Sequence, residues 1–188
     1  STLLSFSFSN ILFAGNNFKN WRPLNDTIMG GASQADCKLT SKGLILEGDL
    51  IEEGGGFISC RSEIFDLPLN LKKYRGIQLA VEGHGRTLKL AIASKSGMFG
   101  VSNWIYEGLR WVIDFPTRDS GITWVDIPFR DLKPTIQAKP IPLPLHFDPS
   151  KIVQIQLLHS KFNQSGGINQ GFRPGSICIL LHSISGLL

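Results

Sequence analysis

Histidines are the side chains best suited to proton transfer near neutral pH, and this chain has four of them. They are His84, His146, His159 and His182. A histidine base needs a nucleophile or a second ionisable group within hydrogen-bond reach. The sequence has no nucleophile elbow, no His-Glu-x-x-His and no paired-carboxylate motif. His84 lies between two glycines and is predicted to be a turn residue, while His159 and His182 are predicted at strand ends, on the surface or at a cavity edge. These patterns predict a protein that is not an enzyme.

The cysteines offer thiolate or metal chemistry, and they are Cys37, Cys60 and Cys178. Arg61 could lower the pKa of the neighbouring Cys60 thiol, but a free cysteine on a strand is more often a small core residue. The sequence has no Cys/His spacing typical of a zinc site. Asp26 alone supplies too few carboxylate ligands for calcium, so no metal and no cofactor is expected. An odd number of widely spaced cysteines argues against a disulfide framework. It predicts an intracellular, reducing compartment, either the cytoplasm or an organellar stroma or matrix.

Carbohydrate binding is a further chemistry to consider, because it needs flat aromatic rings for stacking and polar groups for the hydroxyls. Trp104, Tyr106, Trp111 and Trp124 supply rings, and Asn25, Asp26 and Asn103 supply polar groups. Trp111 and Trp124 belong to alternating stretches and are predicted to pack between sheets. Trp104 and Tyr106 are better candidates for exposure. An exposed aromatic side chain also suits a protein interface, so the two kinds of partner stay open.

The stretch from Trp21 to Ser33 is unlike a regular strand or helix, because turn-forming Asn and Asp and adjacent glycines gather in it. It predicts a folded-back loop that meets a second glycine cluster at Gly54-Gly55-Gly56-Phe57. In this interpretation polar side chains hydrogen-bond the backbone, glycines allow a tight path and Phe57 packs the loop against a sheet. The residues assigned to this motif are Trp21, Asn25, Asp26, Met29, Gly30, Gly31, Ser33, Gly55, Gly56 and Phe57.

Two arginines are candidate partners of the loop. Arg61 and Arg86 are predicted to pair with Asp26 in a buried network. The alternative is that their guanidinium groups face an acidic partner. Together with Trp104 and Tyr106 they are the candidate contact residues.

The elements that must position these residues are strands, because apolar and polar residues alternate along eight stretches. The stretches are 44–50, 57–62, 77–82, 87–92, 111–115, 125–129, 153–157 and 177–181. Gly83-His84-Gly85 between two of them predicts a hairpin. Helical periodicity is absent apart from turns near 66–73 and 148–151. The pattern predicts an all-β protein, an antiparallel β-sandwich.

Two segments interrupt the alternation. Residues 133–146 contain four prolines, which cannot donate to a central ladder, so this segment is predicted to be extended on the surface or to cross between sheets. Residues 161–172 are polar and glycine-rich and are predicted to form a mobile loop before the last strand.

Composition limits the remaining function classes. A chain of 188 residues with 42% hydrophobic and 18% charged residues is expected to form a single domain over 1–188. The formal charge of +4 is spread along the chain, so no nucleic-acid partner is expected. No segment is long and apolar enough to span a bilayer, and the N-terminal residues lack the basic region and apolar core of a signal peptide, although peripheral membrane association is compatible with the sequence.

Four blocks carry a family resemblance. The stretch Trp21…Asn25-Asp26-Thr27-Ile28-Met29-Gly30-Gly31-Ala32-Ser33 resembles the opening motif of the complex I intermediate-associated protein family. Further similar blocks follow in the family's order. They are Gly54-Gly55-Gly56-Phe57-Ile58-Ser59-Cys60-Arg61, Tyr74-Arg75-Gly76-Ile77 with Val81-Glu82-Gly83-His84-Gly85-Arg86, and Trp124-Val125-Asp126-Ile127-Pro128-Phe129 with Pro134. The chain departs from the family pattern at His84, where Asp is favoured, and in the two irregular segments.

The resemblance implies a galactose-binding-like jelly roll, in agreement with the alternation. It also implies a non-catalytic assembly factor or chaperone whose partners are protein subunits or assembly intermediates of a membrane electron-transfer complex, respiratory or photosynthetic. A carbohydrate-binding module on the same jelly roll is the alternative.

Overall fold

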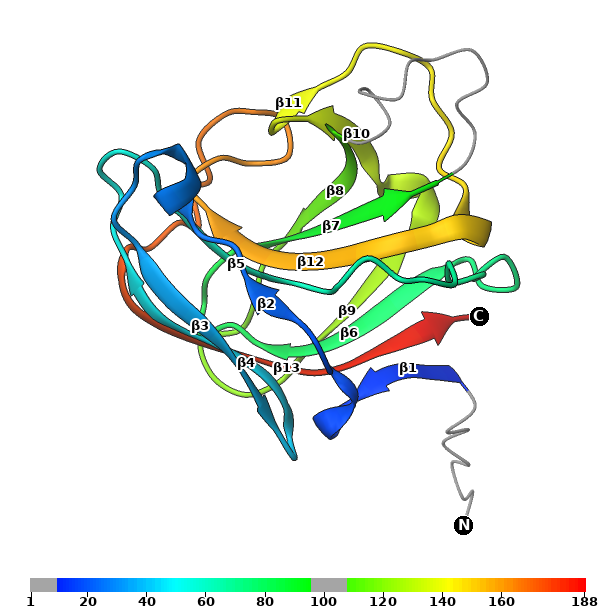
Figure 1. Cartoon of the computed structure of the whole chain (residues 1–188), viewed down its shortest axis with the longest axis horizontal. Coiled ribbons are helices and arrows are strands. Elements are labelled where there is room, and N and C mark those ends of the chain that lie inside the picture. The colour runs from blue at the N-terminus through cyan, green and yellow to red at the C-terminus, as the bar shows by residue number, and fades with distance from the viewer. Residues whose placement is uncertain (1–9, 96–107) are drawn as a thin grey trace.

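The computed structural model describes residues 10–95 and 108–188, which form two antiparallel sheets packed face to face (Figure 1). The six-stranded sheet has the order β3-β4-β13-β6-β9, with β1 also paired to β13. The seven-stranded sheet has the order β11-β10-β8-β7-β12-β5-β2. This is the predicted antiparallel sandwich of the jelly-roll type.

The strand bounds follow the alternating stretches closely. The six-stranded sheet contains β1 (Ile11–Ala14), β3 (Gln34–Thr40), β4 (Gly43–Leu50), β6 (Gly76–Glu82), β9 (Thr123–Pro128) and β13 (Gly175–Leu187). The seven-stranded sheet contains β2 (Arg22–Pro23), β5 (Phe57–Arg61), β7 (Leu88–Ser94), β8 (Leu109–Phe115), β10 (Lys133–Ile136), β11 (Lys139–Pro140) and β12 (Ile152–Ser160). Short 3-10 turns are η2 (Gly15–Asn17), η3 (Asp26–Met29), η4 (Phe129–Asp131) and η5 (Pro149–Lys151).

Alternation places the apolar core between the sheets. On β13, Ile177, Ile179 and Leu181 are buried, and the next buried residue is Ile184 because the register with β6 shifts between Leu181 and Ser183. Such a shift moves the inward face by one residue and keeps the long strand facing the core.

The hairpin predicted at Gly83-His84-Gly85 is wrong. β6 pairs with β9 and β13, whereas β7 pairs with β8 and β12, so this turn crosses from one sheet to the other. Alternation shows that a strand has one buried face but does not show which strand is its neighbour. His84 has a positive φ of 52° and does occupy a turn.

Of the two irregular segments, the first is extended at the surface as predicted and the second differs from its prediction. The start of the proline-rich segment forms β10 and β11 at the edge of the seven-stranded sheet, which fits its prolines. Residues 161–172 form a hydrogen-bonded turn instead of the predicted mobile loop. Phe162 and Ile168 form a bridge, the Asn163 side chain bonds the backbone of its own turn, and the buried Asn169 donates to Ser160 O.

One tryptophan prediction is confirmed and one is wrong. Trp111 is buried between the sheets beside Phe147. Trp124 is 62% exposed because Val125 and Ile127 take the inward positions of β9.

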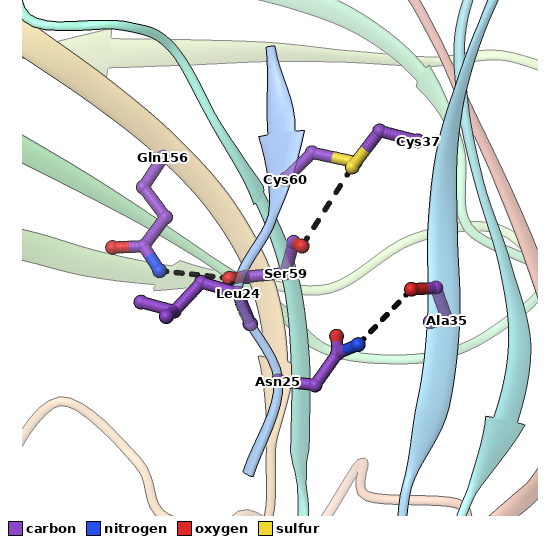
Figure 2. Close-up of a disulfide and its surroundings, with 7 residues drawn as sticks. All are labelled: Leu24, Asn25, Ala35, Cys37, Ser59, Cys60 and Gln156. Atoms are coloured by element: carbon purple, nitrogen blue, oxygen red, sulfur yellow. Dashed lines mark hydrogen bonds between the residues drawn. A yellow bond between two sulfur atoms is a disulfide. The ribbon is translucent and has the colours of Figure 1, made fainter. Parts of the chain in front are cut away.

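The prediction that the cysteines form no disulfide is also wrong. Cys37 on β3 is bonded to Cys60 on β5, with 5.9 Å between their Cα atoms, and only Cys178 is free (Figure 2). The bond links the six-stranded sheet to the seven-stranded sheet. An odd count leaves room for one pair, and β3 and β5 approach each other only in the folded chain. Since disulfides persist in oxidising surroundings, the cysteine count no longer supports a reducing compartment.

Candidate functional site

The Trp21–Ser33 loop is built around the fully buried carboxylate of Asp26. Oδ1 accepts the Ser33 N–H at 3.0 Å, while Oδ2 accepts the Ser33 hydroxyl at 2.7 Å and the Gly56 N–H at 2.8 Å. Burial alone would raise the pKa of Asp26, but the hydrogen bonds from Gly56 and Ser33 outweigh it and lower the pKa below its usual value. One side chain therefore ties the loop to the second glycine cluster.

The glycines leave room for this carboxylate. A Cβ on Gly31 would lie 2.5 Å from Asp26 Oδ1, and a Cβ on Gly55 would lie 2.6 Å from Asp26 Cβ. Gly30 closes η3 with a positive φ of 88°. Beside this turn, the Asn25 side chain donates to Ala35 O across to β3 (Figure 2). The Trp21–Ser33 loop and the second glycine cluster are thus held together at the edge of the sandwich, and we call this unit the shelf.

The predicted pairing of Asp26 with arginines is wrong, because Asp26 is satisfied by neutral donors alone. Arg86 lies elsewhere, buried beside β13, where it donates to Arg173 O at 3.2 Å and to Ser176 O at 2.9 Å. Arg61 lies on β5 and faces a groove on the outside of the sandwich.

The histidine placements predicted from sequence need correction. His159 is fully buried near the end of β12, where its Nδ1 donates to Thr87 O and its Nε2 accepts the Arg173 N–H. Burial, assisted by the charges of Arg86 and Arg173, lowers the pKa of His159 to about 4, so the ring is a neutral structural group. His182 lies within β13 rather than at its end, with Nε2 2.7 Å from Glu82 Oε2.

A groove of about 620 Å³ lies on the outer face of the seven-stranded sheet. Figure 1 shows the three segments that rise around this face: the loop with η3, the β10–β11 turn and the segment 161–172. Residues from the loop and the second glycine cluster form one wall, namely Leu24, Ile28, Met29, Gly55, Gly56 and Phe57. Residues from the β10–β11 turn and segment 161–172 form the other, including Thr135, Gln137, Ala138, Phe162 and Gln164.

The floor is hollow because a small residue occupies its centre. Ala91 on β7 lies opposite Val112 on one side and opposite Gln156 on the other. Arg61 lies opposite Gln156 on the next strand. Larger side chains therefore flank a small one on both neighbouring strands, which leaves a depression over Ala91.

Cations give the groove its charge. Arg61, Lys89 and Arg110 all line it. Burial lowers the pKa of Lys89, although the charge of Asp114 opposes this effect, and its Nζ donates to Phe162 O at 2.9 Å. A second hollow of about 560 Å³ continues past Arg61 and Arg110 toward Arg22 and Glu63.

The structure brings only part of the predicted site together. Met29, Gly55, Gly56, Phe57 and Arg61 line the groove. Trp21, buried against Phe13 and Phe18, and the Asp26 cluster support it from behind. Arg86 lies apart, and Trp104 and Tyr106 lie outside the described residues.

Sequence reasoning missed the floor residues Lys89, Arg110 and Gln156. Lys89 was visible as an outward position of a predicted strand, and Arg110 and Gln156 lie on outward positions of β8 and β12.

Within the described ranges, no group of three or more His, Cys, Asp or Glu side chains could hold a metal ion, and no helix is long and apolar enough to cross a membrane.

The fold is an antiparallel β-sandwich of the galactose-binding-like jelly-roll class, with a groove on the outer face of one sheet. The family model of complex I intermediate-associated protein 30 (CIA30) matches residues 11–178, and the chain belongs to this family. An uncharacterized protein of Schizosaccharomyces pombe is 26% identical over 159 residues, which cover 79% of this chain and 73% of that protein.

Solved structures share the fold. The family 11 carbohydrate-binding module from Clostridium thermocellum, in complex with a β-1,3-1,4-mixed-linked tetrasaccharide, has a TM-score of 0.65 at 17% identity, over 95% of this chain and 94% of that one. The agarase AgWH50C has a TM-score of 0.55 at 9% identity, over 95% of this chain and 26% of that one. At such identities the likeness shows the fold alone.

Proposed function

We propose that this chain acts as a single-domain, non-enzymatic assembly factor that binds a protein subunit or assembly intermediate of a membrane electron-transfer complex. Membership of the CIA30 family supports this role. We place the contact at the outer groove and the shelf beside it, and we place the protein at the surface of the membrane that carries the complex.

The observation that carries the contact assignment is the exposed apolar rim of the groove. Ile28 and Met29 are 69% and 60% exposed at the tip of the loop, above Phe57. Asp26 and three glycines fix the backbone beneath them, so these side chains are held toward solvent instead of collapsing inward. Met, aromatic and Arg side chains are enriched at protein interfaces, and a rigid display reduces the entropy lost on binding.

The ionisable groups support a binding role over a catalytic one. Asp26 and His159 are both fully buried, and the polar atoms of both are occupied by internal partners. Neither side chain can reach a molecule in the groove. We therefore assign both to the scaffold.

The test is a tagged pull-down from detergent-solubilised membranes of the native host. Wild-type protein is expected to recover subunits of the electron-transfer complex, whereas Ile28→Asp is expected to lose them, because a charge replaces the apolar rim. Leu67→Asp is the matched control, since Leu67 is an exposed aliphatic residue outside the groove. Equal recovery by all three proteins would remove the rim from the interface, and no recovery by wild type would overturn the assembly role.

Carbohydrate binding is the second candidate. The groove offers the side-chain amides of Gln137, Gln156 and Gln164 together with the rings of Phe57 and Phe162, which suit hydroxyls and a sugar face. A glycan array with the same wild-type protein separates the two candidates. Retention on defined glycans, with a clean pull-down, would favour this one.

A further inference from the structure

Two arginines face each other at the open end of the groove. Arg22 on β2 lies directly opposite Arg61 on β5 in the antiparallel register, and both line the second hollow. Like charges in opposed positions of a sheet repel each other and destabilise the pairing. Within residues 10–95 and 108–188, neither guanidinium makes a hydrogen bond or an ion pair, so the repulsion is not relieved internally.

The surroundings of the pair are basic. The two hollows share Arg61 and Arg110, and Lys89 stands farther along the floor. Glu63 is the one acidic residue among the described lining residues, and it accepts a hydrogen bond from Asn20 rather than an arginine. Asp114 lies opposite Lys89, where Gln164 N donates to it, so it does not neutralise the arginine end. A channel of this charge attracts anions.

The apolar lining beside these charges favours a polypeptide. The wall of the groove carries the apolar side chains of Leu24, Ile28 and Met29, and Leu158 and Val112 continue this lining on the floor. A groove with arginines at one end and an apolar lining elsewhere matches a polypeptide segment, whose side chains can differ in charge along its length.

We propose that the two hollows form one groove for an extended acidic peptide segment, whose carboxylates bind Arg22 and Arg61 while its apolar side chains fill the depression over Ala91. The proposal rests on the assembly-factor function and names the chemistry of its partner. Carboxylates neutralise the opposed arginines, and bidentate pairing with a guanidinium fixes the register of the segment.

The test uses fluorescence anisotropy with a fluorescein-labelled decapeptide that carries Glu residues in one half and Leu residues in the other. A matched peptide carries Gln in place of every Glu, and an oligogalacturonate serves as an acidic sugar competitor. The acidic peptide is expected to bind at least about tenfold more tightly than the Gln peptide, and its affinity should fall as the salt concentration rises.

Variants locate the binding. Arg61→Gln and Arg22→Gln are each expected to weaken binding of the acidic peptide by about tenfold. Arg130→Gln removes one exposed positive charge on η4, outside both hollows, and is expected to stay within about twofold of wild type. Equal binding of both peptides, an equal loss in Arg130→Gln, or stronger binding of oligogalacturonate would each overturn the proposal.

A parallel pull-down tests the acidic-segment proposal separately from the proposed assembly-factor function. If wild type and the Arg22→Gln/Arg61→Gln double variant recover complex subunits equally, the assembly role stands and the acidic-segment proposal fails. If wild type recovers none, the assembly role fails, and the peptide panel still decides what the groove binds.

Discussion

At the scale of single residues, two ionisable groups with shifted pKa values, Asp26 and His159, serve the scaffold. The Asp26 carboxylate accepts three hydrogen bonds, and the His159 ring donates one hydrogen bond to the backbone and accepts one from it. Their environments favour opposite charge states, because the donors around Asp26 stabilise an anion while burial of His159 favours the neutral ring. Both shifts connect the stability of the fold to pH.

The stability of the protein is expected to fall as the pH drops from 6.5 toward 4. The pKa of His159 is lowered to about 4 in the folded chain, against an ordinary value of 6.5, so the unfolded chain takes up the proton first. This contribution to the free energy of unfolding is fully present above pH 6.5. About 3 kcal/mol of it is lost once the pH has fallen to the pKa of the folded chain. Urea unfolding from pH 7.5 to 4 measures this slope.

A matched control isolates the histidine. His84→Asn replaces the histidine of an exposed turn with a residue that tolerates its positive φ, and its pH slope is compared with that of the wild type. An NMR titration of His159 with a midpoint near 6.5 would contradict the prediction.

At the scale of elements, the loop and the second glycine cluster behave as one unit because the Asp26 carboxylate fills the space between them. Gly31 has ordinary backbone angles, so its role is steric: a Cβ would overlap the carboxylate. Gly31→Ala is expected to lower the free energy of unfolding by roughly 2 kcal/mol. Gly108→Ala is the control, because among the described residues its Cβ would meet Ile136 Cγ2 alone, at an ordinary 3.6 Å. Equal unfolding midpoints for the two variants in urea would argue against the packed carboxylate.

Strands could be predicted from the sequence, but their neighbours could not. Alternation marked the inward face of β4, β6, β7, β12 and β13, since burying one face requires a period of two. It missed β3, whose residues Ala35, Cys37 and Leu39 form a weak apolar face. It also paired β6 with β7, because a turn between two strands looks alike in a hairpin and in a crossing between sheets.

The candidate site was predictable only where unusual residues mark it. Asn-Asp and Gly-Gly signal a special backbone, and they led to the shelf with Met29 and Phe57. Arg110 and Gln156 are ordinary outward residues of their strands. They become part of one floor only because β8, β7 and β12 are neighbours in the sheet, and that order is a property of the whole fold.

At the scale of the whole molecule, the two sheets are joined near the shelf by a covalent bond. Cys37 on β3 and Cys60 on β5 close a sequence separation of 23 residues, beside the contact of Asn25 with Ala35 (Figure 2). The same region carries one wall of the groove, so the disulfide holds this wall of the seven-stranded sheet against the six-stranded sheet. A bond of this span restricts the unfolded chain and stabilises the folded one.

Loss of the disulfide is therefore expected to lower the free energy of unfolding by about 3 kcal/mol, and the melting temperature by roughly 10 °C. The double variant Cys37→Ala/Cys60→Ala and the wild type in reducing agent should show the same loss. Cys178→Ala removes the exposed free thiol and should melt like the wild type, since Cys178 lies outside the disulfide. Mass spectrometry after alkylation without reductant should find one modified cysteine in the wild type. Three modified cysteines would mean that the sheets are held by packing alone.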